Sequence, residues 1–252
     1  MKYKLTKNKK TIGEITLYQI EALKDFLNVK KGDLGGWIEK ESNLSQQGDC
    51  WVSGDARVCD NAIVSDNAWV FGNAWVYGDA RVSGCAEISG DAWVSGSAEV
   101  TGDARVYGDA WVYGDARVSG CAEISGRVYG DAMVYGDAMV YGDAMVYGDA
   151  IVSGNAMVSS NAMVSGNAIV SGNARVFGNA WVSGNARVFG NARVSGDAWV
   201  YGRARVYGDA WVSGDDMVYG DAWVTGSAEF TGDAWVYGDS IDLYGELSKS
   251  NK

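Results

Sequence analysis

A six-residue repeat decides what this chain can fold into. From Val52 to Val236 an aliphatic residue, replaced once by Phe230, recurs every six positions with one shorter interval, and two places before it stands a small residue, nearly always Ala. The unit reads G-D/N-A-x-V-x, and strand alternation predicts that Ala and Val face inward and the x residues outward. Six residues cannot cover their own apolar face. Each unit buries that face only by stacking on copies above and below, which predicts a solenoid.

The Gly and the Asp or Asn that follows it are predicted to form the corners between short strands, because these residues tolerate positive φ. Columns of Asp, such as Asp131 and Asp149, raise the alternative of bound calcium. Calcium-binding solenoids use a nine-residue Gly/Asp repeat, which is absent, and Asn replaces Asp freely from Asn155 to Asn191. We therefore expect no metal site, and expect Asp and Asn to hydrogen-bond the backbone of their own corner.

The unit resembles the hexapeptide repeat, aliphatic-x-x-x-small-x, with Val as the aliphatic residue and Ala as the small one. The resemblance covers about four fifths of the chain, with 32 aliphatic positions from Val52 to Val236. It implies an all-β fold, a left-handed parallel β-helix shaped as a triangular prism, with three hexads in each coil. The chain would then make between 10 and 11 coils. Ile38 and Leu44, also six apart, are candidates for an imperfect first coil.

One short unit affects which outward residues share a face. Between Ile124 and Val128 only "SGRV" is present, and the coherence of the outward columns favours a register in which this fragment still fills one side of the prism. One outward column then starts at Arg57, includes Arg127, and is otherwise Trp and Met. These Trp and Met residues form the predicted interaction face: Trp75, Trp93, Trp111, Met145, Met163, Trp181, Trp199, Met217 and Trp235.

This column predicts a binding surface. Exposed apolar strips of such size are unusual on soluble monomers, and each Trp can bury roughly 150 to 250 Å². We expect self-association or binding of a protein partner along this face. The alternative is that the stacked Trp rings only shield one another and the strands. Resemblance to hexapeptide proteins, which are commonly trimers, implies a homotrimer or another small homo-oligomer.

Catalysis is not expected. Many members of the resembled family are acyltransferases that use acetyl-CoA or acyl carrier protein with a His as general base, and its carbonic anhydrases hold zinc with three His. This chain contains no His, so neither site can be assembled. We predict no catalytic residue, no cofactor and no metal. Cys50, Cys59, Cys85 and Cys121 are predicted to be reduced thiols, since their spacing is neither metal-like nor that of a disulfide framework.

Charge divides the chain into a basic head and an acidic body. Residues 1–31 carry eight Lys against three acidic residues, whereas the remainder has 13 basic against 29 acidic residues. The net charge of −11 argues against direct nucleic-acid binding. It leaves open an alternative function, an inhibitor that mimics nucleic acid and binds a host defence protein or a DNA- or RNA-binding enzyme. Asn in the Asp columns and Arg on the faces weaken that alternative.

Three segments are expected. Residues 1–37 form a cap with a hairpin from Tyr3 to Ile20 around the turn "KNKK" and a short helix near Glu21 to Phe26. Trp37 is expected to act as a plug where the cap meets the first coil. Residues 38–239 form the β-helix and 240–252 a C-terminal cap or tail.

The cap joined to hexads resembles small uncharacterised proteins of phages, prophages and bacterial genomes, which suggests an origin and implies no activity. No signal peptide and no apolar membrane span is expected, which favours the cytoplasm of a bacterial host. The function that we expect is that of a non-catalytic scaffold or interaction protein. An acyltransferase is a less favoured alternative.

Overall fold

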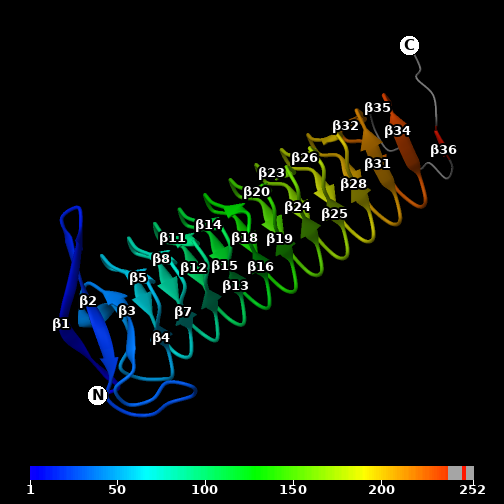
Figure 1. Ribbon diagram of the computed structural model, residues 1–252. Helices are drawn as coiled ribbons and strands as arrows, with labels where there is room; N and C mark the ends of the chain where they lie inside the picture. Colours follow the sequence, from blue (N-terminus) through cyan, green and yellow to red (C-terminus); the bar gives the residue numbers. More distant parts are fainter. Residues whose placement is uncertain (238–245, 248–252) are drawn as a thin grey trace. The chain divides into compact units, whose positions relative to one another are not determined.

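The chain divides into two compact units, Met1–Ser125 (unit 1) and Gly126–Lys252 (unit 2). The computed structural model describes residues 1–237 and 246–247. Within those residues the only helix is a short 3-10 turn, η1 (Glu41–Asn43), and the rest of the regular structure is β (Figure 1). Each unit contains three sheets of stacked, mostly two-residue parallel strands. The predicted all-β solenoid is therefore confirmed.

Unit 1 starts with three longer strands that lead into the stack. β1 (Tyr3–Ile12) pairs antiparallel with β2 (Ile15–Ala22), and β2 pairs antiparallel with β3 (Leu34–Ile38). β3 then pairs in parallel with β5, so the three cap strands and the repeat strands that follow belong to one sheet, the first sheet.

The repeat strands of unit 1 extend three sheets. The first sheet continues from β3 with β5 (Arg57–Val58), β8 (Trp75–Val76), β11 (Trp93–Val94) and β14 (Trp111–Val112). The second sheet contains β4 (Trp51–Val52), β7 (Trp69–Val70), β10 (Glu87–Ile88), β13 (Arg105–Val106) and β16 (Glu123–Ile124). The third sheet contains β6 (Ile63–Val64), β9 (Arg81–Val82), β12 (Glu99–Val100) and β15 (Arg117–Val118).

Unit 2 also has three sheets of this kind. Its first sheet contains β17 (Arg127–Val128), β20 (Met145–Val146), β23 (Met163–Val164), β26 (Trp181–Val182), β29 (Trp199–Val200), β32 (Met217–Tyr219) and β35 (Trp235–Tyr237). Its second sheet contains β19 (Met139–Val140), β22 (Met157–Val158), β25 (Arg175–Val176), β28 (Arg193–Val194), β31 (Trp211–Gly214), β34 (Glu229–Gly232) and β36 (Glu246–Leu247). Its third sheet contains β18 (Met133–Val134), β21 (Ile151–Val152), β24 (Ile169–Val170), β27 (Arg187–Val188), β30 (Arg205–Val206) and β33 (Trp223–Val224).

The interior consists of the Ala and Val of the repeat. Ala74 and Val76, for example, are fully buried, as are the corresponding residues of the coils around them. Backbone hydrogen bonds join successive coils both in the strands and at the corners: the amide of Trp75 donates to the Ala92 carbonyl at 2.9 Å, and that of Asp79 to the Gly96 carbonyl at 2.8 Å. Burying one Val contributes roughly 1.5 to 3 kcal/mol. Because nearly every coil repeats the same core, most of the variation between coils lies in the outward side chains.

The corners require Gly for two reasons. Gly96 has φ +67°, and a Cβ added there would lie 2.8 Å from the backbone nitrogen of Gly114 in the next coil. Positive φ strains residues with a side chain, and the close approach leaves no room for one. Asp60, Asp66 and Ser160 occupy this place with φ of +56°, +57° and +61°.

The short "SGRV" unit does fill a side of a coil. Arg127–Val128 forms strand β17, which pairs with β20. Gly126 takes the place that Ala holds elsewhere, because an added Cβ would lie 2.6 Å from the Ala144 carbonyl oxygen. The favoured register is thereby confirmed within unit 2. Ile38 and Leu44 do belong to a first coil, since they pair with Val58 and Val64.

The predictions for the cap need three corrections. The hairpin is present, but its turn is Gly13–Glu14, between the paired Ile12 and Ile15, and "KNKK" lies within β1. Gly13 has φ +60°. Two-residue hairpin turns need positive φ, which Gly adopts more easily than Lys does.

The helix near Glu21 to Phe26 is also absent. Glu21 and Ala22 end β2, and Phe26 and Val29 form an antiparallel bridge. A segment of about six residues is too short to stabilise a helix against such tertiary contacts.

Trp37 is not a plug. It is half-buried, and its ring lies under the Lys10 ammonium, with 4.3 Å between Nζ and the ring centroid. Trp51, which is 3% exposed, packs against Tyr3 and Phe26 and closes the first coil instead. The expected boundaries at residues 37 and 239 stay predictions, and the C-terminal segment, apart from 246–247 in β36, lies outside the described residues.

Candidate functional site

The first sheet of unit 1 carries the first part of the predicted interaction face. Trp75, Trp93 and Trp111 occupy the same position in paired strands β8, β11 and β14, and each points outward because the neighbouring Val points inward. The rings of Trp93 and Trp111 stack with centroids 5.3 Å apart and planes 5° from parallel. Trp75 meets Trp93 edge to face at 5.5 Å. We call these three residues the unit 1 Trp column.

The stacked rings shield one another only in part. Trp93 is 37% exposed and Trp111 is 43% exposed. Each ring covers one face of its neighbour, while the outer edges stay in contact with solvent. The alternative of a self-shielding ladder therefore explains why the faces of the Trp rings are buried. It does not cover their outer edges, which form a continuous aromatic strip along the column.

A second column, which the sequence analysis did not single out, borders the first. The residue after each Val, at the same 18-residue interval, is Tyr77, then Ser95, then Tyr113. Tyr77 contacts both Trp75 and Trp93, at 5.2 and 6.2 Å between centroids. Since Ser95 is small, an aromatic notch of about 150 Å³ opens between Tyr77, Trp93, Trp111 and Tyr113. The sequence predicts this second column when the residues that follow Val are compared at 18-residue intervals.

Unit 2 carries the remaining residues of the predicted face on its own first sheet. Seven outward residues follow one another in register along this sheet: Arg127, Met145, Met163, Trp181, Trp199, Met217 and Trp235. Trp181 and Trp199 stack with centroids 4.9 Å apart. Beside them, Tyr201, Tyr219 and Tyr237 form a stacked series. Each unit therefore groups its own share of the predicted residues, and their role in binding stays a prediction.

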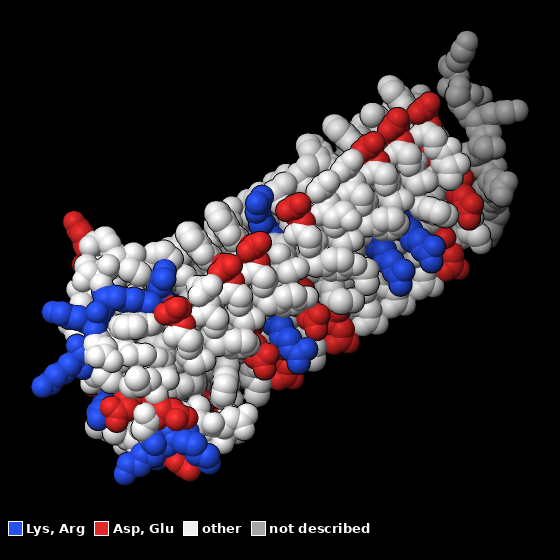
Figure 2. All heavy atoms as spheres, in the orientation of Figure 1, with Lys and Arg blue, Asp and Glu red and all other residues white. Residues whose placement is uncertain are grey.

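The other faces carry charged side chains, arranged differently in the two units. Basic and acidic side chains are interspersed on the face seen in Figure 2. On the second sheet of unit 1, Arg105 lies between two carboxylates, with Nε 3.7 Å from Glu87 and Nη1 3.3 Å from Glu123. In unit 2, Arg175 pairs in register with Arg193, so two like charges are adjacent there.

The polar corners are built differently from the prediction. Several Asn side chains donate to the Asn or Asp one coil further on, as Asn155 does to Asn173 and Asn173 to Asn191, each at 3.0 Å. Asn191 donates in turn to Asp209 at 2.9 Å. The predicted bonds to the backbone of the same corner are not what these side chains make. Because coils stack in register, an identical side chain in the next coil is the nearest partner.

Chemistry for catalysis is sparse in this structure. The chain has no His, and the described residues contain no group of three or more Cys, Asp or Glu arranged to hold a metal ion. Burial raises the pKa of the Cys59 thiol to about 11 and raises that of Cys50 as well, so neither is a ready nucleophile. Cys85 and Cys121 are exposed, and all four cysteines, each in a described segment, are free of disulfides.

No helix in the part of the chain that the structure describes has the length and hydropathy needed to cross a bilayer.

Comparison with known proteins supports the repeat assignment. A family model described as the YdcK beta solenoid repeat matches six segments, residues 56–72, 127–141, 138–154, 170–184, 186–202 and 198–214. A protein named "Uncharacterized acetyltransferase YdcK", from Escherichia coli (strain K12), is 45% identical over 42 residues, which are 17% of this chain and 13% of that protein. The match thus spans a small part of that relative. Together with three sheets of stacked hexads in each unit, these matches identify the chain as a hexapeptide-repeat β-solenoid protein.

Proposed function

We propose that this protein is a non-catalytic interaction protein that self-associates through the outward aromatic columns of its first sheets. The observation that carries the proposal is the unit 1 Trp column with its bordering Tyr residues. Five aromatic rings on one face, each partly exposed, present on the order of a few hundred Å² of apolar surface. Surfaces of this kind lose water favourably when they meet a complementary surface.

Self-association fits the geometry of the column. Trp93 and Trp111 project from short strands held rigidly by the coils above and below, so little side-chain freedom is lost on binding. A second copy offers the same rings and the same notch at Ser95. A trimer, common among hexapeptide proteins, is the assembly that we propose.

Acyl transfer is not part of the proposal. The relative that carries an acetyltransferase name aligns with this chain over 42 residues, 13% of its own length, which is too small a part to carry over an activity. General-base catalysis near neutral pH is most readily performed by His, which this chain lacks.

Nucleic-acid mimicry is less well supported. A mimic needs closely spaced negative charge, whereas the corner columns of unit 2 contain neutral Asn ladders and its faces carry paired Arg side chains. Capture of a nucleic-acid enzyme that is lost at high salt would favour mimicry. Capture that survives high salt and needs the Trp columns would favour the aromatic interface.

Light scattering tests the proposal. The parent is expected to show about three times the 26.8 kDa chain mass. A Trp93→Ser/Trp111→Ser variant is expected to be a folded monomer, because it loses the stacked rings of the face but no core residue.

The matched control is Trp211→Ser/Trp223→Ser, which removes two outward Trp residues from the other two sheets. We expect it to keep the parent mass, and circular dichroism would verify the fold of both variants. A monomeric parent, or a Trp93/Trp111 variant that keeps the parent mass, would refute self-association through this face.

A further inference from the structure

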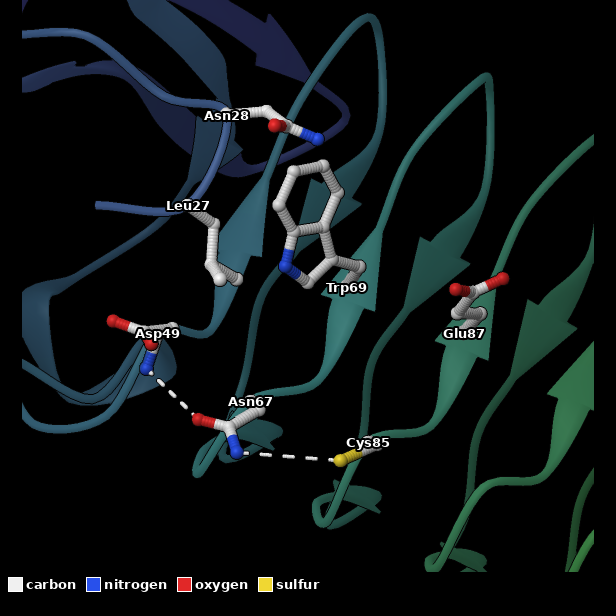
Figure 3. A pocket seen from close by; sticks show the side chains of 7 residues that line it. All are labelled: Leu27, Asn28, Asp49, Asn67, Trp69, Cys85 and Glu87. Carbon is white, nitrogen blue, oxygen red and sulfur yellow. Dashed lines mark hydrogen bonds between the residues drawn. The ribbon is translucent and has the colours of Figure 1, made fainter. Parts of the chain in front are cut away.

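A cleft of about 460 Å³ lies in unit 1 on the side of the second sheet (Figure 3). The turn between Phe26 and Val29 supplies one wall, and the second sheet with its corner supplies the others. The cleft is lined by Leu27, Asn28, Asp49, Asn67, Trp69, Cys85 and Glu87. Neither the repeat nor the aromatic columns require it.

The cleft exists because the cap covers one coil and stops. Trp51 is buried under Tyr3 and Phe26. One coil further along the same sheet, Trp69 pairs in register with Trp51 but is only half-buried. Leu27 and Asn28 of the cap turn line the cleft beside this second ring, as Figure 3 shows.

Leu27 is held in an unfavourable state. It is 60% exposed although apolar, and its φ of +42° is strained for a residue with a branched side chain. Such strain is more often found where a binding site needs a particular geometry. Leu27 and Trp69 together make the apolar wall of the cleft.

The far side of the cleft is acidic. Glu87 pairs in register with Trp69, so its carboxylate lies one coil beyond the indole. Its side chain is 51% exposed, and its ion pair with Arg105 Nε is long at 3.7 Å. Arg105 approaches Glu123 more closely, at 3.3 Å. A carboxylate accepts several hydrogen bonds, so Glu87 retains capacity for a second cation.

The acidic lining extends along the corner. A second cavity of about 410 Å³ shares Cys85 and Glu87 with the first and adds Asp103, Arg105, Cys121 and Glu123. The two cavities thus bring four carboxylates, those of Asp49, Glu87, Asp103 and Glu123, together with one guanidinium. The floor is polar but uncharged at Asn67, whose side chain accepts from the Asp49 amide at 3.2 Å and donates to Cys85 Sγ at 4.0 Å.

We propose that this groove binds an extended, lysine-rich segment of a partner protein. The alkyl stem of one lysine lies on Leu27 and the face of Trp69, and its ammonium reaches Glu87. A cation over an indole is attracted by the ring quadrupole, and here the carboxylate attracts the same cation. The excess of carboxylates over cations selects a basic segment over an acidic one. The five corner positions from Asp49 to Cys121 span about 19 Å at the usual strand spacing, room for about six extended residues.

Binding of fluorescein-labelled hexalysine, measured by fluorescence anisotropy at low ionic strength, tests the proposal. Trp69→Ala keeps every charge, and we expect it to weaken binding about tenfold. Glu87→Gln is expected to weaken binding severalfold and to reduce its salt dependence. Leu27→Asn tolerates positive φ, so it removes the apolar wall without disturbing the turn, and it should also weaken binding.

The chain supplies a matched control in Trp211, which pairs in register with Glu229 on the second sheet of unit 2 just as Trp69 pairs with Glu87. The described residues of unit 2 contain no isolated bridge like that of Phe26 and Val29, so Trp211→Ala should bind like the parent. A hexalysine acetylated on every side chain should not bind. The proposal is wrong if the parent does not bind hexalysine, if Trp69→Ala binds like the parent, or if Trp211→Ala loses as much affinity. These outcomes do not depend on self-association, which uses the first sheets.

Discussion

In unit 1 the outward column of the first sheet places Trp on Trp, whereas in unit 2 a column built the same way begins with Arg127, Met145 and Met163 and reaches Trp only at Trp181. Behind both columns the core is the same Ala and Val, fully buried. The backbone therefore accepts very different outward side chains without changing its hydrogen bonds. The surface of such a solenoid therefore varies in its outward columns, while the interior stays the same.

Charge differs between the units in a similar way. Unit 1 alternates Glu87, Arg105 and Glu123 along one sheet, so that each neighbour attracts the next. Unit 2 instead stacks Arg187 on Arg205, and the Arg205 guanidinium lies 4.8 Å from the centroid of the Trp223 ring. A cation over an aromatic ring offsets part of the repulsion between adjacent cations. The same kind of core thus supports two arrangements of outward charge, alternating Glu and Arg in unit 1 and stacked Arg beside a Trp ring in unit 2.

The largest expected effect comes from breaking what both units share, the Gly corners. Gly96 in unit 1 and Gly184 in unit 2 have the same φ of +67°, but an added Cβ would lie 2.8 Å from Gly114 N and 3.1 Å from Gly202 N respectively. We expect Gly184→Ala to lower the free energy of unfolding by about 1 to 2 kcal/mol, the cost of the left-handed conformation. Gly96→Ala should cost about 1 kcal/mol more, because backbone must also move.

Urea denaturation of the two variants would measure this difference. Equal losses would mean that φ alone sets the requirement for Gly, and that the closer approach in unit 1 has no energetic consequence.

A smaller effect, a gain in stability, is expected at a corner of unit 2 that has Ser in place of Gly. Ser160 holds φ +61° at a place that Gly occupies in the coils on either side, at Gly142 and Gly178. Ser160→Gly removes the strain but increases the freedom of the unfolded chain, so we expect a net gain of about 0.5 to 1 kcal/mol. Thermal unfolding with Gly142→Ser as the opposite control would test it. A gain for Gly142→Ser, or a loss for Ser160→Gly, would contradict the account.

The repeat predicted most of the fold because one physical rule applies at every coil. Inward Ala and Val, Gly corners and the strand made by "SGRV" all follow from the six-residue pattern. The cap did not follow, because its hairpin turn at Gly13–Glu14 and the bridge at Phe26 depend on contacts that no repeat encodes. The cleft was missed for the same reason. Trp69 looks like any other outward Trp until the cap is seen to end one coil before it.

The corner hydrogen bonds illustrate a different limit. Asn and Asp were expected to bond their own corner, which is the usual local behaviour of these residues. In a stack, however, Asn173 lies beside Asn155 and Asn191, and the bond across coils replaces the local one. The stacking of coils, which the repeat predicts, therefore decides the hydrogen-bond partners of these Asn side chains, and their local preference does not.

The smallest expected effect concerns Asp216, which in unit 2 stands where the core otherwise has Ala. Burial raises the pKa of its carboxyl above the usual 3.8, with the nearby Asp233 and Asp215 adding to the rise and hydrogen bonds from the Ala234 and Ser213 amides opposing it. A raised pKa means that the folded state favours the protonated acid. Its contribution to stability is complete below about pH 3.8 and is lost as pH rises through the folded pKa.

Asp216→Asn cannot ionise, so the variant should gain stability relative to the parent as pH increases from 4 to 7. Asn has one acceptor oxygen in place of two, so the variant loses one of the two amide hydrogen bonds. Because Asn does not titrate, this loss is the same at both pH values. Urea midpoints of the two proteins at each pH would measure the change. Because the two amide hydrogen bonds oppose the effect of burial on the pKa, we expect a change smaller than that of Ser160→Gly. A difference between variant and parent that stays constant, or that shrinks toward pH 7, would show that the buried carboxylate carries no penalty in unit 2, and that the core tolerates a charge as readily as the outward columns do.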